Sequence, residues 1–210
     1  MPDNQRLPYR RSIRLYQYDY SQEAYYFITV CTQDRLCVFG DICEGKMQIN
    51  QAGSMILKTW NQLPERFTHM KLDEFIVMPN HIHGVFKLNQ IKKQIPGDGA
   101  TKNYAHGTSS HTVGRIMQAF KSMTTNFYIQ GVKTLNWPAF PGKLWQRDYW
   151  DRVIVDDREL HGVREYIIHN PSTWESDYLF SGGSGQTTWR DEHTWRDEHE
   201  VRPSTGNKGN

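Results

Sequence analysis

The sequence contains no long hydrophobic run, and this absence excludes an ordinary membrane-spanning segment. No stretch approaches the roughly 18 consecutive apolar residues that a transmembrane helix needs. The first residues, MPDNQRLPYRRSIRL, carry charges and proline where a secretory signal would have an apolar segment. We therefore expect a cytoplasmic protein with no membrane partner.

Cysteine and net charge are also scarce. Cys31, Cys37 and Cys43 are an odd number and form no Cys-x-x-Cys pair, so we expect reduced, packed thiols and not a cysteine metal site. The formal net charge of +2 neither requires nor excludes a nucleic-acid partner, because a basic groove can exist within a balanced total. Composition alone does not decide between these classes of partner.

The hydrophobic content of 37% over 210 residues predicts one folded domain of ordinary size. We place this domain at residues 1–180. Residues 89–112 hold several glycines and almost no apolar side chain, so they are predicted to form a mobile surface loop. Residues 181–210 contain the hexapeptide TWRDEH twice, which is too short a repeat for a solenoid and is typical of a disordered extension.

Four segments have the composition of β-strands. Residues 24–32, AYYFITVCT, are rich in aromatic and β-branched types and predict a buried strand. Residues 74–78 and 81–88 flank the turn-forming pair Pro79-Asn80, so they predict a hairpin. Residues 152–155 predict a short fourth strand.

Two apolar stripes with steps of three and four residues predict amphipathic helices. The first should end at Pro64. The second helix has a polar, partly basic face opposite its apolar stripe, and this face either is simply solvated or binds phosphates. The stripes consist of Ile49, Ala52, Ile56, Trp60 and Leu63, and of Val113, Ile116, Met117, Phe120, Met123 and Phe127.

A third helix is predicted after the fourth strand. Asp156 and Glu159 have the spacing of a capping box, which marks the start of a helix. The helix should run through Tyr166 and stop before Pro171. Because a residue before proline avoids helical geometry, Asn170 should lie in the final turn.

His81 and His83 are two apart in a predicted strand, so both imidazoles point to the same side of the sheet. A strand can build two adjacent metal ligands in this way. By itself, however, such a pair is also compatible with two hydrogen-bonded or surface histidines.

Tyr166 and Asn170 are four apart and share one face of the predicted helix. If that face meets the sheet beside His81 and His83, potential metal ligands and a hydroxyl nucleophile converge. Such a site suits phosphodiester transesterification, in which a divalent cation stabilises charge on the phosphate and the tyrosine forms a covalent phosphotyrosine. The alternative is a tyrosine at the edge of the core with its hydroxyl in water.

Three longer segments, followed by REYIIHNP, occur in a specific order between about Arg10 and Trp174. They are RRSIRLYQYDYSQEAYYFITVCTQDRLCVFGD, FIVMPNHIHGVFKL and LWQRDYWDRVI. In this arrangement they resemble the REP-associated branch of the single-tyrosine transposases that carry a histidine-hydrophobic-histidine motif. The resemblance implies an α+β fold with a ferredoxin-like antiparallel sheet, the histidine pair on a central strand and the tyrosine on a late helix.

The resemblance also implies a function. By position, His81 and His83 match the metal ligands of the family, Tyr166 matches its nucleophile, and Asn170 matches a polar residue that completes the metal site. His169 is the alternative third ligand. The family binds hairpins formed by imperfect palindromes and cleaves and rejoins single-stranded DNA through a 5′-phosphotyrosine, with magnesium or manganese. Zinc stays an alternative metal, and both a monomer and a homodimer fit.

Basic residues near aromatic ones are the candidates for DNA contacts, because single-strand binders combine phosphate-binding cations with stacking rings. The amino-terminal group also contains Tyr16 and Tyr18, and its alternative role is to cover an edge strand. The predicted DNA-binding residues are Arg10, Arg11, Arg14, Arg115, Lys121, Arg147 and Arg152.

Three other functions are compatible with the sequence. A domesticated descendant would recognise hairpin DNA without cleaving it. An RNA-binding protein would use the same sheet and aromatic residues for hairpin RNA. A metal-dependent hydrolase would use water and form no covalent intermediate, so it would not need the hydroxyl of Tyr166.

Overall fold

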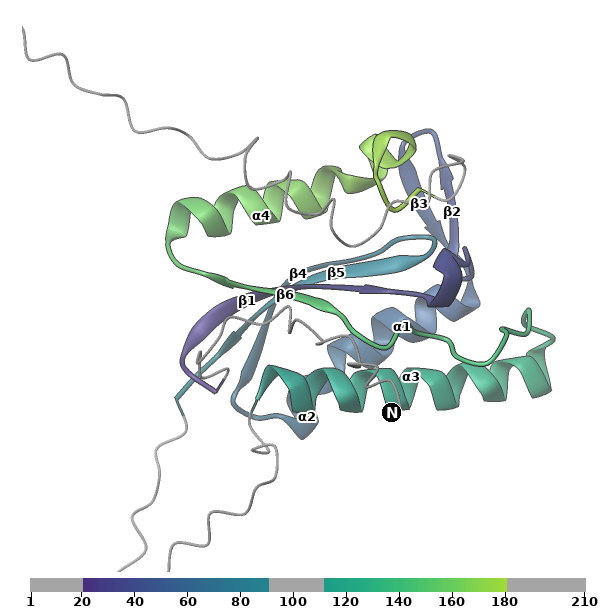
Figure 1. Cartoon of the computed structure of the whole chain (residues 1–210), viewed down its shortest axis with the longest axis horizontal. Helices are drawn as coiled ribbons and strands as arrows, with labels where there is room; N and C mark the ends of the chain where they lie inside the picture. Colours follow the sequence, from purple (N-terminus) through teal and green to yellow (C-terminus); the bar gives the residue numbers. More distant parts are fainter. Residues whose placement is uncertain (1–20, 91–111, 181–210) are drawn as a thin grey trace, which may run out of the picture.

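The computed structural model describes residues 21–90 and 112–180, which form a four-stranded antiparallel sheet with helices on both faces (Figure 1). The strands lie in the order β4-β5-β1-β6. Helices α1, α2 and α3 lie on one side of the sheet and α4 lies on the other. The strands of this sheet are β1 (Ala24–Cys31), β4 (Met70–Val77), β5 (His81–Leu88) and β6 (Trp150–Ile154). The helices are α1 (Gln51–Asn61), α2 (Leu63–Arg66), α3 (Val113–Leu135) and α4 (Asp157–His169).

Two 3-10 turns and a hairpin complete the architecture of the described residues. The hairpin consists of β2 (Gly40–Cys43) and β3 (Lys46–Ile49), which pair in a separate two-stranded sheet. The 3-10 turns are η1 (Gln33–Arg35) and η2 (Asn170–Ser176), and η2 directly follows α4. Most of the predicted loop at 89–112 and the whole predicted tail at 181–210 lie outside the described residues.

The order of the main strands along the chain confirms the predicted ferredoxin-like architecture. A strand, a helical segment, two hairpin-paired strands, a helix and a final strand follow one another, which is the β-α-β-β-α-β arrangement. The first and third of these strands, β1 and β5, occupy the centre of the sheet. His81 and His83 therefore lie on a central strand, and Tyr166 lies on the late helix α4, as predicted.

Alternation along the strands divides the core into two layers. Side chains of β1 such as Tyr26 and Ile28 pack with α1 and α3 in the larger cluster. Phe27, between them, points to the other face and packs with Leu160, Val163 and other residues of α4 in a smaller cluster. The face that carries the predicted site is thus covered by α4 alone among the four α-helices.

A bulge explains why only part of β4 was predicted. The strand begins at Met70 and not at Glu74, and its pairing with β5 shifts between Leu72 and Phe75. Asp73 and Glu74 both oppose the single residue Val85, which is the pattern of a β-bulge. The extra residue breaks the regular alternation by which the sequence would indicate a strand.

Three details of the predicted helices are wrong. Pro64 does not end α1 but lies in the first turn of α2, where proline has no hydrogen-bonding N–H to lose. Ile49 belongs to β3. On α3 the buried stripe continues through Thr124 and Tyr128, whereas the predicted Phe127 is largely exposed.

The three cysteines are free thiols, as expected, but they are not all packed. Cys31 is buried on β1, whereas Cys37 and Cys43 are exposed. The prediction of packing is wrong for these two because both lie on the small hairpin β2–β3 or in the segment before it, away from the main core. Over residues 21–90 and 112–180, no helix has the length and apolar character that crossing a membrane requires.

Gly84 follows His83 on strand β5 and faces the larger core on the opposite side of the sheet. A Cβ atom at this position would lie 2.7 Å from Cζ2 of Trp60 and 3.0 Å from Cδ2 of Phe75. Those rings stack on each other with centroids 4.4 Å apart, so neither can move away without disturbing the other. Gly84 is thus required by the close approach of the α1 side chain to the sheet.

We expect Gly84→Ala to lower the free energy of unfolding by about 1–3 kcal/mol, because it overpacks the Trp60–Phe75 contact. Denaturant titration of the purified variant measures the change. The matched control is Gly162→Ala on α4, where an added Cβ meets nothing within 4 Å. This control should be neutral or stabilising by up to about 1 kcal/mol. Equal stability of both variants would contradict the close-packing argument.

Candidate active site

The two histidines of β5 face each other on the α4 side of the sheet. Alternation directs His81 and His83 to the same face, and their Nε2 atoms lie 3.0 Å apart. Both side chains are at most 1% exposed. Two imidazole nitrogens at this separation can bind one cation from adjacent positions.

Asn80 determines which nitrogen of His81 carries the proton. The Asn80 Nδ2 group donates to the carbonyl oxygens of Leu179 at 2.8 Å and Arg35 at 3.3 Å. Its Oδ1 therefore faces His81 Nδ1, at 2.8 Å, and can only accept. His81 must carry its proton on Nδ1, which leaves the lone pair of Nε2 directed at the other histidine.

His83 has a less restrictive partner. Its Nδ1 lies 2.8 Å from the hydroxyl oxygen of Thr29, which is directly opposite on β1. A hydroxyl can donate or accept, so it supports either tautomer of His83. When His83 donates from Nδ1 to Thr29, its Nε2 is free to bind a cation together with Nε2 of His81.

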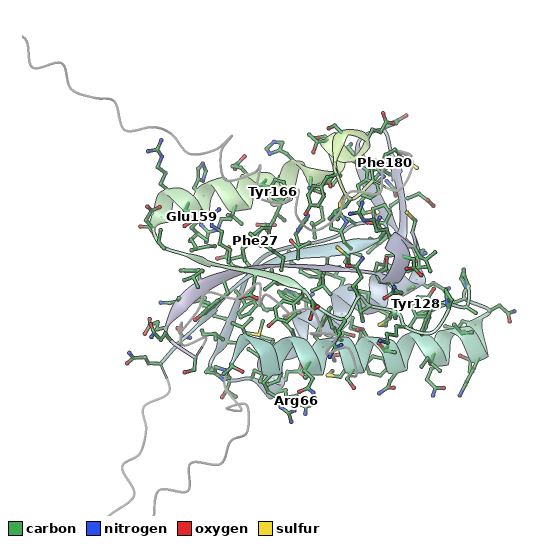
Figure 2. All side chains as sticks on the ribbon, viewed as in Figure 1. Phe27, Arg66, Tyr128, Glu159, Tyr166 and Phe180 are labelled. Carbon is green, nitrogen blue, oxygen red and sulfur yellow. The ribbon has the colours of Figure 1, made fainter. Side chains whose placement is uncertain are left out.

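Tyr166 reaches the histidine pair from α4. Its hydroxyl oxygen lies 3.3 Å from Nε2 of His83. The ring packs edge-on against Phe27 of β1 with centroids 6.1 Å apart, and Figure 2 shows both side chains in the space between α4 and the sheet. The structure thus brings the predicted tyrosine to the predicted histidines.

The third group at this centre is Asp177, which the sequence analysis did not identify. One ligand atom each of His81, His83 and Asp177 all lie within 4.8 Å of one another. Asp177 comes just after η2, and its Oδ1 accepts from the N–H of Leu179 at 2.7 Å. Two imidazoles and one carboxylate are a donor set that fits a divalent cation.

Asn170 and His169, the predicted third ligands, have different surroundings. Asn170 is 1% exposed, and its Nδ2 donates to Oδ2 of Asp177 at 3.1 Å. Its Oδ1 is buried and has no hydrogen-bond partner within the described residues. His169 is exposed, and its ring bonds to the carbonyl oxygen of Glu165 on its own helix, so the structure does not bring it to the pair.

Burial governs the protonation of the whole group. Desolvation lowers the pKa of His83 to about 3 and, together with the neighbouring His83 and Arg35 charges, lowers the pKa of His81 well below its usual value. Burial also raises the pKa of Asp177, against the opposing effects of Leu179 N–H and Asn170. The site therefore favours two neutral imidazoles, which is the form that binds metal.

These shifts predict that the metal-free protein loses stability on acidification. A histidine whose folded pKa is depressed stabilises the fold above its unfolded value of about 6.5, and this stability is lost as the pH falls towards the folded value. Between pH 7 and pH 5 the loss should be about 2 kcal/mol for His83, and the lowered pKa of His81 adds to it in the same direction. The contribution of Asp177 to the pH dependence of stability has the opposite sign, because its raised pKa favours proton uptake by the folded state. Asp177 therefore offsets part of the loss of stability at acidic pH.

Denaturant titrations in EDTA at pH 7 and pH 5 measure this dependence. The double variant His81→Gln/His83→Gln should show a much flatter dependence on pH. An unchanged free energy of unfolding in the unsubstituted protein between these two pH values would mean that the pair becomes protonated within the fold.

Four of the predicted DNA-binding residues lie within the described part of the chain, on α3, on the segment before β6 and on β6 itself. Arg10, Arg11 and Arg14 lie outside the described residues. Arg115 is exposed on α3 and bonds to Gln118. Helix α3 is on the side of the sheet opposite α4 and the histidine pair (Figure 1).

Lys121, also on α3, uses its ammonium group within the protein. It donates to the carbonyl oxygens of Gln146, Arg147 and Asp148 at 2.9, 3.3 and 3.0 Å, and burial lowers its pKa to about 8. The Lys121 ammonium group therefore contacts the backbone of the segment before β6. Of the remaining two predicted residues, Arg147 is exposed on that segment, and Arg152 on β6 pairs with Glu159 of α4 at 2.6 Å.

Comparisons with known proteins find a relative by sequence and several similar solved structures. A Haemophilus influenzae protein described as uncharacterized is 33% identical over 180 residues, which cover 84% of this chain and 96% of the relative. No family model matches the chain.

The structure of a REP-associated tyrosine transposase bound to a REP hairpin matches with a TM-score of 0.50 and 14% identity, over 77% of this chain and 74% of that one. A candidate transposase of Deinococcus radiodurans matches with a TM-score of 0.43 and 15% identity, over 74% and 95% of the two chains. The first of these matches shows a shared fold, which is the fold that the sequence resemblance predicted.

Proposed function

The chain belongs to the same family as the Haemophilus influenzae protein and has the fold of the REP-associated tyrosine transposase, and on this basis we propose that it is a metal-dependent single-stranded DNA transesterase. It would bind hairpin-forming repeats and cleave and rejoin DNA through a 5′-phosphotyrosine. The reaction class is that of DNA transposition.

One observation carries the proposal: a phenolic hydroxyl lies beside a buried group of potential cation ligands. The Tyr166 hydroxyl is 3.3 Å from His83, and His81, His83 and Asp177 offer ligand atoms within 4.8 Å of one another. These residues come from β5, α4 and the segment after η2. A nucleophile next to a cation site is the arrangement that phosphoryl transfer by a tyrosine needs.

The residues present fit a divalent cation. The imidazoles are neutral, and the hydrogen bonds of their Nδ1 atoms to Asn80 and Thr29 orient the rings so that both Nε2 atoms can bind a cation. The carboxylate of Asp177 supplies negative charge. The buried Asn170 Oδ1 without a described partner is a further oxygen in the same region. When bound, Mg²⁺ or Mn²⁺ would stabilise negative charge on the scissile phosphate and lower the pKa of the attacking phenol.

The remaining roles belong to the chain itself. Tyr166 would attack the phosphorus atom, so that a bond forms between its oxygen and phosphorus while the bond to the 3′ oxygen breaks and leaves a 3′ hydroxyl. The covalent intermediate preserves the phosphodiester energy for rejoining. Phe27 packs against both the Tyr166 and His83 rings and limits their motion.

The partner would be single-stranded or hairpin DNA. The solved structure with the shared fold is described as bound to a REP hairpin. Of the predicted DNA contacts, Arg152 is on the strand next to β1 and reaches α4, so it is the described candidate on the face that bears the site. Arg147, an exposed cation in the segment before β6, is the second described candidate for a DNA contact.

The proposal is tested with labelled single-stranded hairpin DNA from the region flanking the gene of this protein. The protein is incubated with the DNA and Mg²⁺ or Mn²⁺, and the products are separated on a denaturing gel. We expect a covalent protein–DNA band that maps to Tyr166 by mass spectrometry and disappears with EDTA. Tight hairpin binding without any band, in both metals and with several hairpins, would instead indicate a DNA-binding protein without cleavage activity.

A further inference from the structure

The position of Tyr166 depends on how α4 lies on the sheet, and the apolar contacts of this helix are few. The cluster beneath it contains Leu160, Val163 and Ile167 from the helix, packed on Phe27, Val85 and Ile154. The opposite face of the sheet carries a far larger cluster. Polar contacts therefore have a greater share in holding α4 in place.

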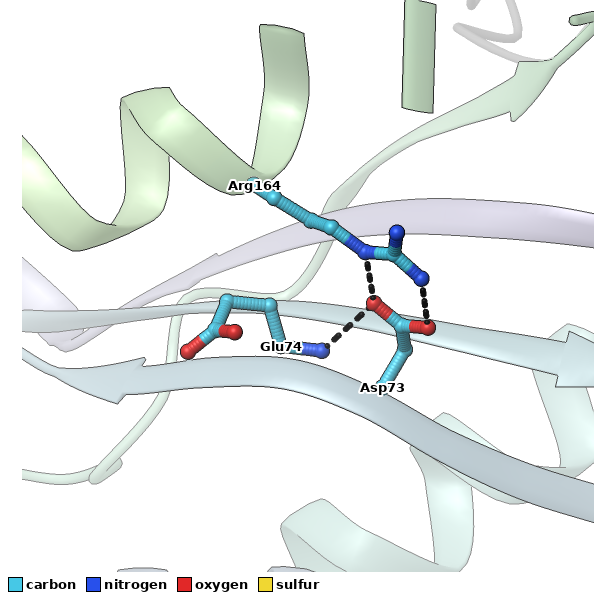
Figure 3. Close-up of polar contacts among 3 residues, drawn as sticks. All are labelled: Asp73, Glu74 and Arg164. Atoms are coloured by element: carbon cyan, nitrogen blue, oxygen red, sulfur yellow. Dashed lines mark hydrogen bonds and ion pairs between the residues drawn. The ribbon is translucent and has the colours of Figure 1, made fainter. Parts of the chain in front are cut away.

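A bidentate ion pair joins α4 to the edge strand β4. Arg164 donates from Nε to Oδ1 of Asp73 at 2.7 Å and from Nη2 to Oδ2 at 2.5 Å (Figure 3). The pairing is bidentate, which fixes orientation as well as distance. The Arg164 guanidinium also holds the pKa of Asp73 below its usual value, so the carboxylate is charged at neutral pH.

Asp73 is directed at α4 by the bulge in β4. Two residues, Asp73 and Glu74, oppose Val85, and such an insertion leaves one backbone group without its ladder partner. The N–H of Glu74 donates instead to Oδ1 of Asp73, at 2.9 Å. The same carboxylate thus stabilises the bulge and binds Arg164, as Figure 3 shows.

Arg164 and Tyr166 lie on opposite flanks of the buried stripe of α4. Successive residues of a helix are about 100° apart, so these two point about 200° from each other around the axis. Arg164 reaches the edge strand β4, and Tyr166 reaches Phe27 and His83 on the central strands. A rotation of the helix about its axis would therefore break the first contact and displace the second.

We propose that Asp73 and Arg164 are positioning residues that fix the rotation of α4 and so hold the Tyr166 hydroxyl beside the histidine pair. This inference rests on the proposed function for its catalytic consequence. Neither residue touches the reacting groups. A displacement of about 1 Å at a reacting atom can cost roughly a hundredfold in rate, so the loss of this contact should be visible mainly in the cleavage step.

Three substitutions distinguish the effect of losing the ion pair from the effect of disturbing the bulge. Asp73→Asn keeps an oxygen for the N–H of Glu74 but removes the charge that pairs with Arg164. Arg164→Met removes the guanidinium and keeps an apolar stem, whereas Arg164→Lys keeps the charge without the bidentate geometry. The control is Glu23→Gln, which breaks the 2.8 Å ion pair between Glu23 and Lys87 at a site that is not on α4 and where the carboxylate is more exposed than that of Asp73.

The first readout is the rate of covalent adduct formation at saturating hairpin DNA, together with the dissociation constant for the hairpin. We expect Asp73→Asn and Arg164→Met to slow adduct formation by about 10- to 100-fold. Arg164→Lys should recover part of this rate. The dissociation constant should stay within about twofold throughout, and Glu23→Gln should match the unsubstituted protein.

The second readout does not depend on catalysis. With 3-fluorotyrosine placed only at position 166, the ¹⁹F resonance reports the surroundings of that ring in each variant. Asp73→Asn and Arg164→Met should move or broaden the resonance, and Glu23→Gln should leave it unchanged. Thermal melting of every variant identifies any that fail to fold. If Asp73→Asn and Arg164→Met fail to fold, the milder variant Arg164→Lys still tests the inference.

The outcomes distinguish this inference from the proposed function. Unchanged adduct rates, or a loss that disappears at saturating DNA, would overturn the positioning role. If the unsubstituted protein forms no adduct, the proposed function fails, and the ¹⁹F resonance alone decides the inference. A resonance that moves in Asp73→Asn then still supports positioning of Tyr166, and one that does not move contradicts it.

Discussion

Replacing Tyr166 with phenylalanine should abolish the covalent protein–DNA adduct while leaving the affinity for hairpin DNA almost unchanged. The substitution removes only the hydroxyl, which lies 3.3 Å from His83, and keeps the ring that packs on Phe27. Loss of a catalytic nucleophile costs up to about 10⁶ in rate in well-studied enzymes, so we expect a decrease of at least roughly a thousandfold. A denaturing gel measures the adduct, and a mobility shift assay measures hairpin binding.

The matched control for this prediction is Tyr128→Phe on α3. Tyr128 is buried in the larger cluster, and its hydroxyl donates to the carbonyl oxygen of Pro138 at 3.0 Å. This variant loses one hydrogen bond, worth about 1 kcal/mol of stability, and should form the adduct at the normal rate. Continued cleavage by Tyr166→Phe would remove Tyr166 from its proposed role and favour a hydrolase that uses water.

Substituting either histidine of β5 is expected to have an effect of similar size. His81→Ala and His83→Ala each remove one candidate ligand from the group formed with Asp177. Loss of a residue that merely orients a ligand lowers metal affinity 10- to 100-fold, so loss of a ligand should lower it by more than about a hundredfold. Calorimetric titration with Mn²⁺ measures the affinity, and the gel assay should show no adduct.

A buried histidine elsewhere provides the control. His69 is largely buried next to Phe67, and β4 begins at the neighbouring residue, opposite the far end of β5. His69→Gln should therefore bind Mn²⁺ normally. Full Mn²⁺ affinity in His81→Ala would contradict a metal site at the pair.

Substitutions of Asp177 and Asn170 should lower metal affinity and cleavage by different amounts. Asp177→Asn removes the only carboxylate of the group, so its effect should approach that of the histidine variants. Asn170→Ala should cost less, since water can take the coordination position of an amide oxygen. A larger effect of Asn170→Ala than of Asp177→Asn would return Asn170 to the role of third ligand.

The central part of the site could be predicted because each element follows a short-range rule. Two histidines two apart in a strand must share a face, and Tyr166 four residues before Asn170 must share a helical face with it. Asp156 caps α4 as its spacing with Glu159 indicates, with a bond of 2.7 Å from the Glu159 N–H. Local geometry of this kind needs no knowledge of the rest of the chain.

Asp177 could not be found in this way. It lies in an irregular segment after η2, and an acidic residue there has no periodicity that would distinguish it from a solvated one. Its place at the site follows from tertiary packing of η2, in which Trp174 and Leu179 join Cys31 and Met78 in a third cluster. Position in space, and not pattern in sequence, makes it a candidate ligand.

The β2–β3 hairpin, in contrast, had a signal that was missed. Glu44 and Gly45 form a two-residue turn in which both residues have positive φ, 51° and 69°, and such turns commonly end in glycine. The flanking strands have four residues each and are largely exposed, so they are too short for hydrophobic alternation to reveal them. Turn chemistry would have been the better guide here.

The hydrogen bonds of Asn80 have a consequence for when the protein can first act during its synthesis. His81 is oriented by Asn80, and Asn80 is held by the carbonyl of Leu179, close to the last described residue. A nascent chain that ends before this point has both histidines but neither Asp177 nor the carbonyl that holds Asn80. Translation from His83 to Leu179 takes roughly 5 to 20 s, and throughout that time an emerging chain would lack a complete candidate site.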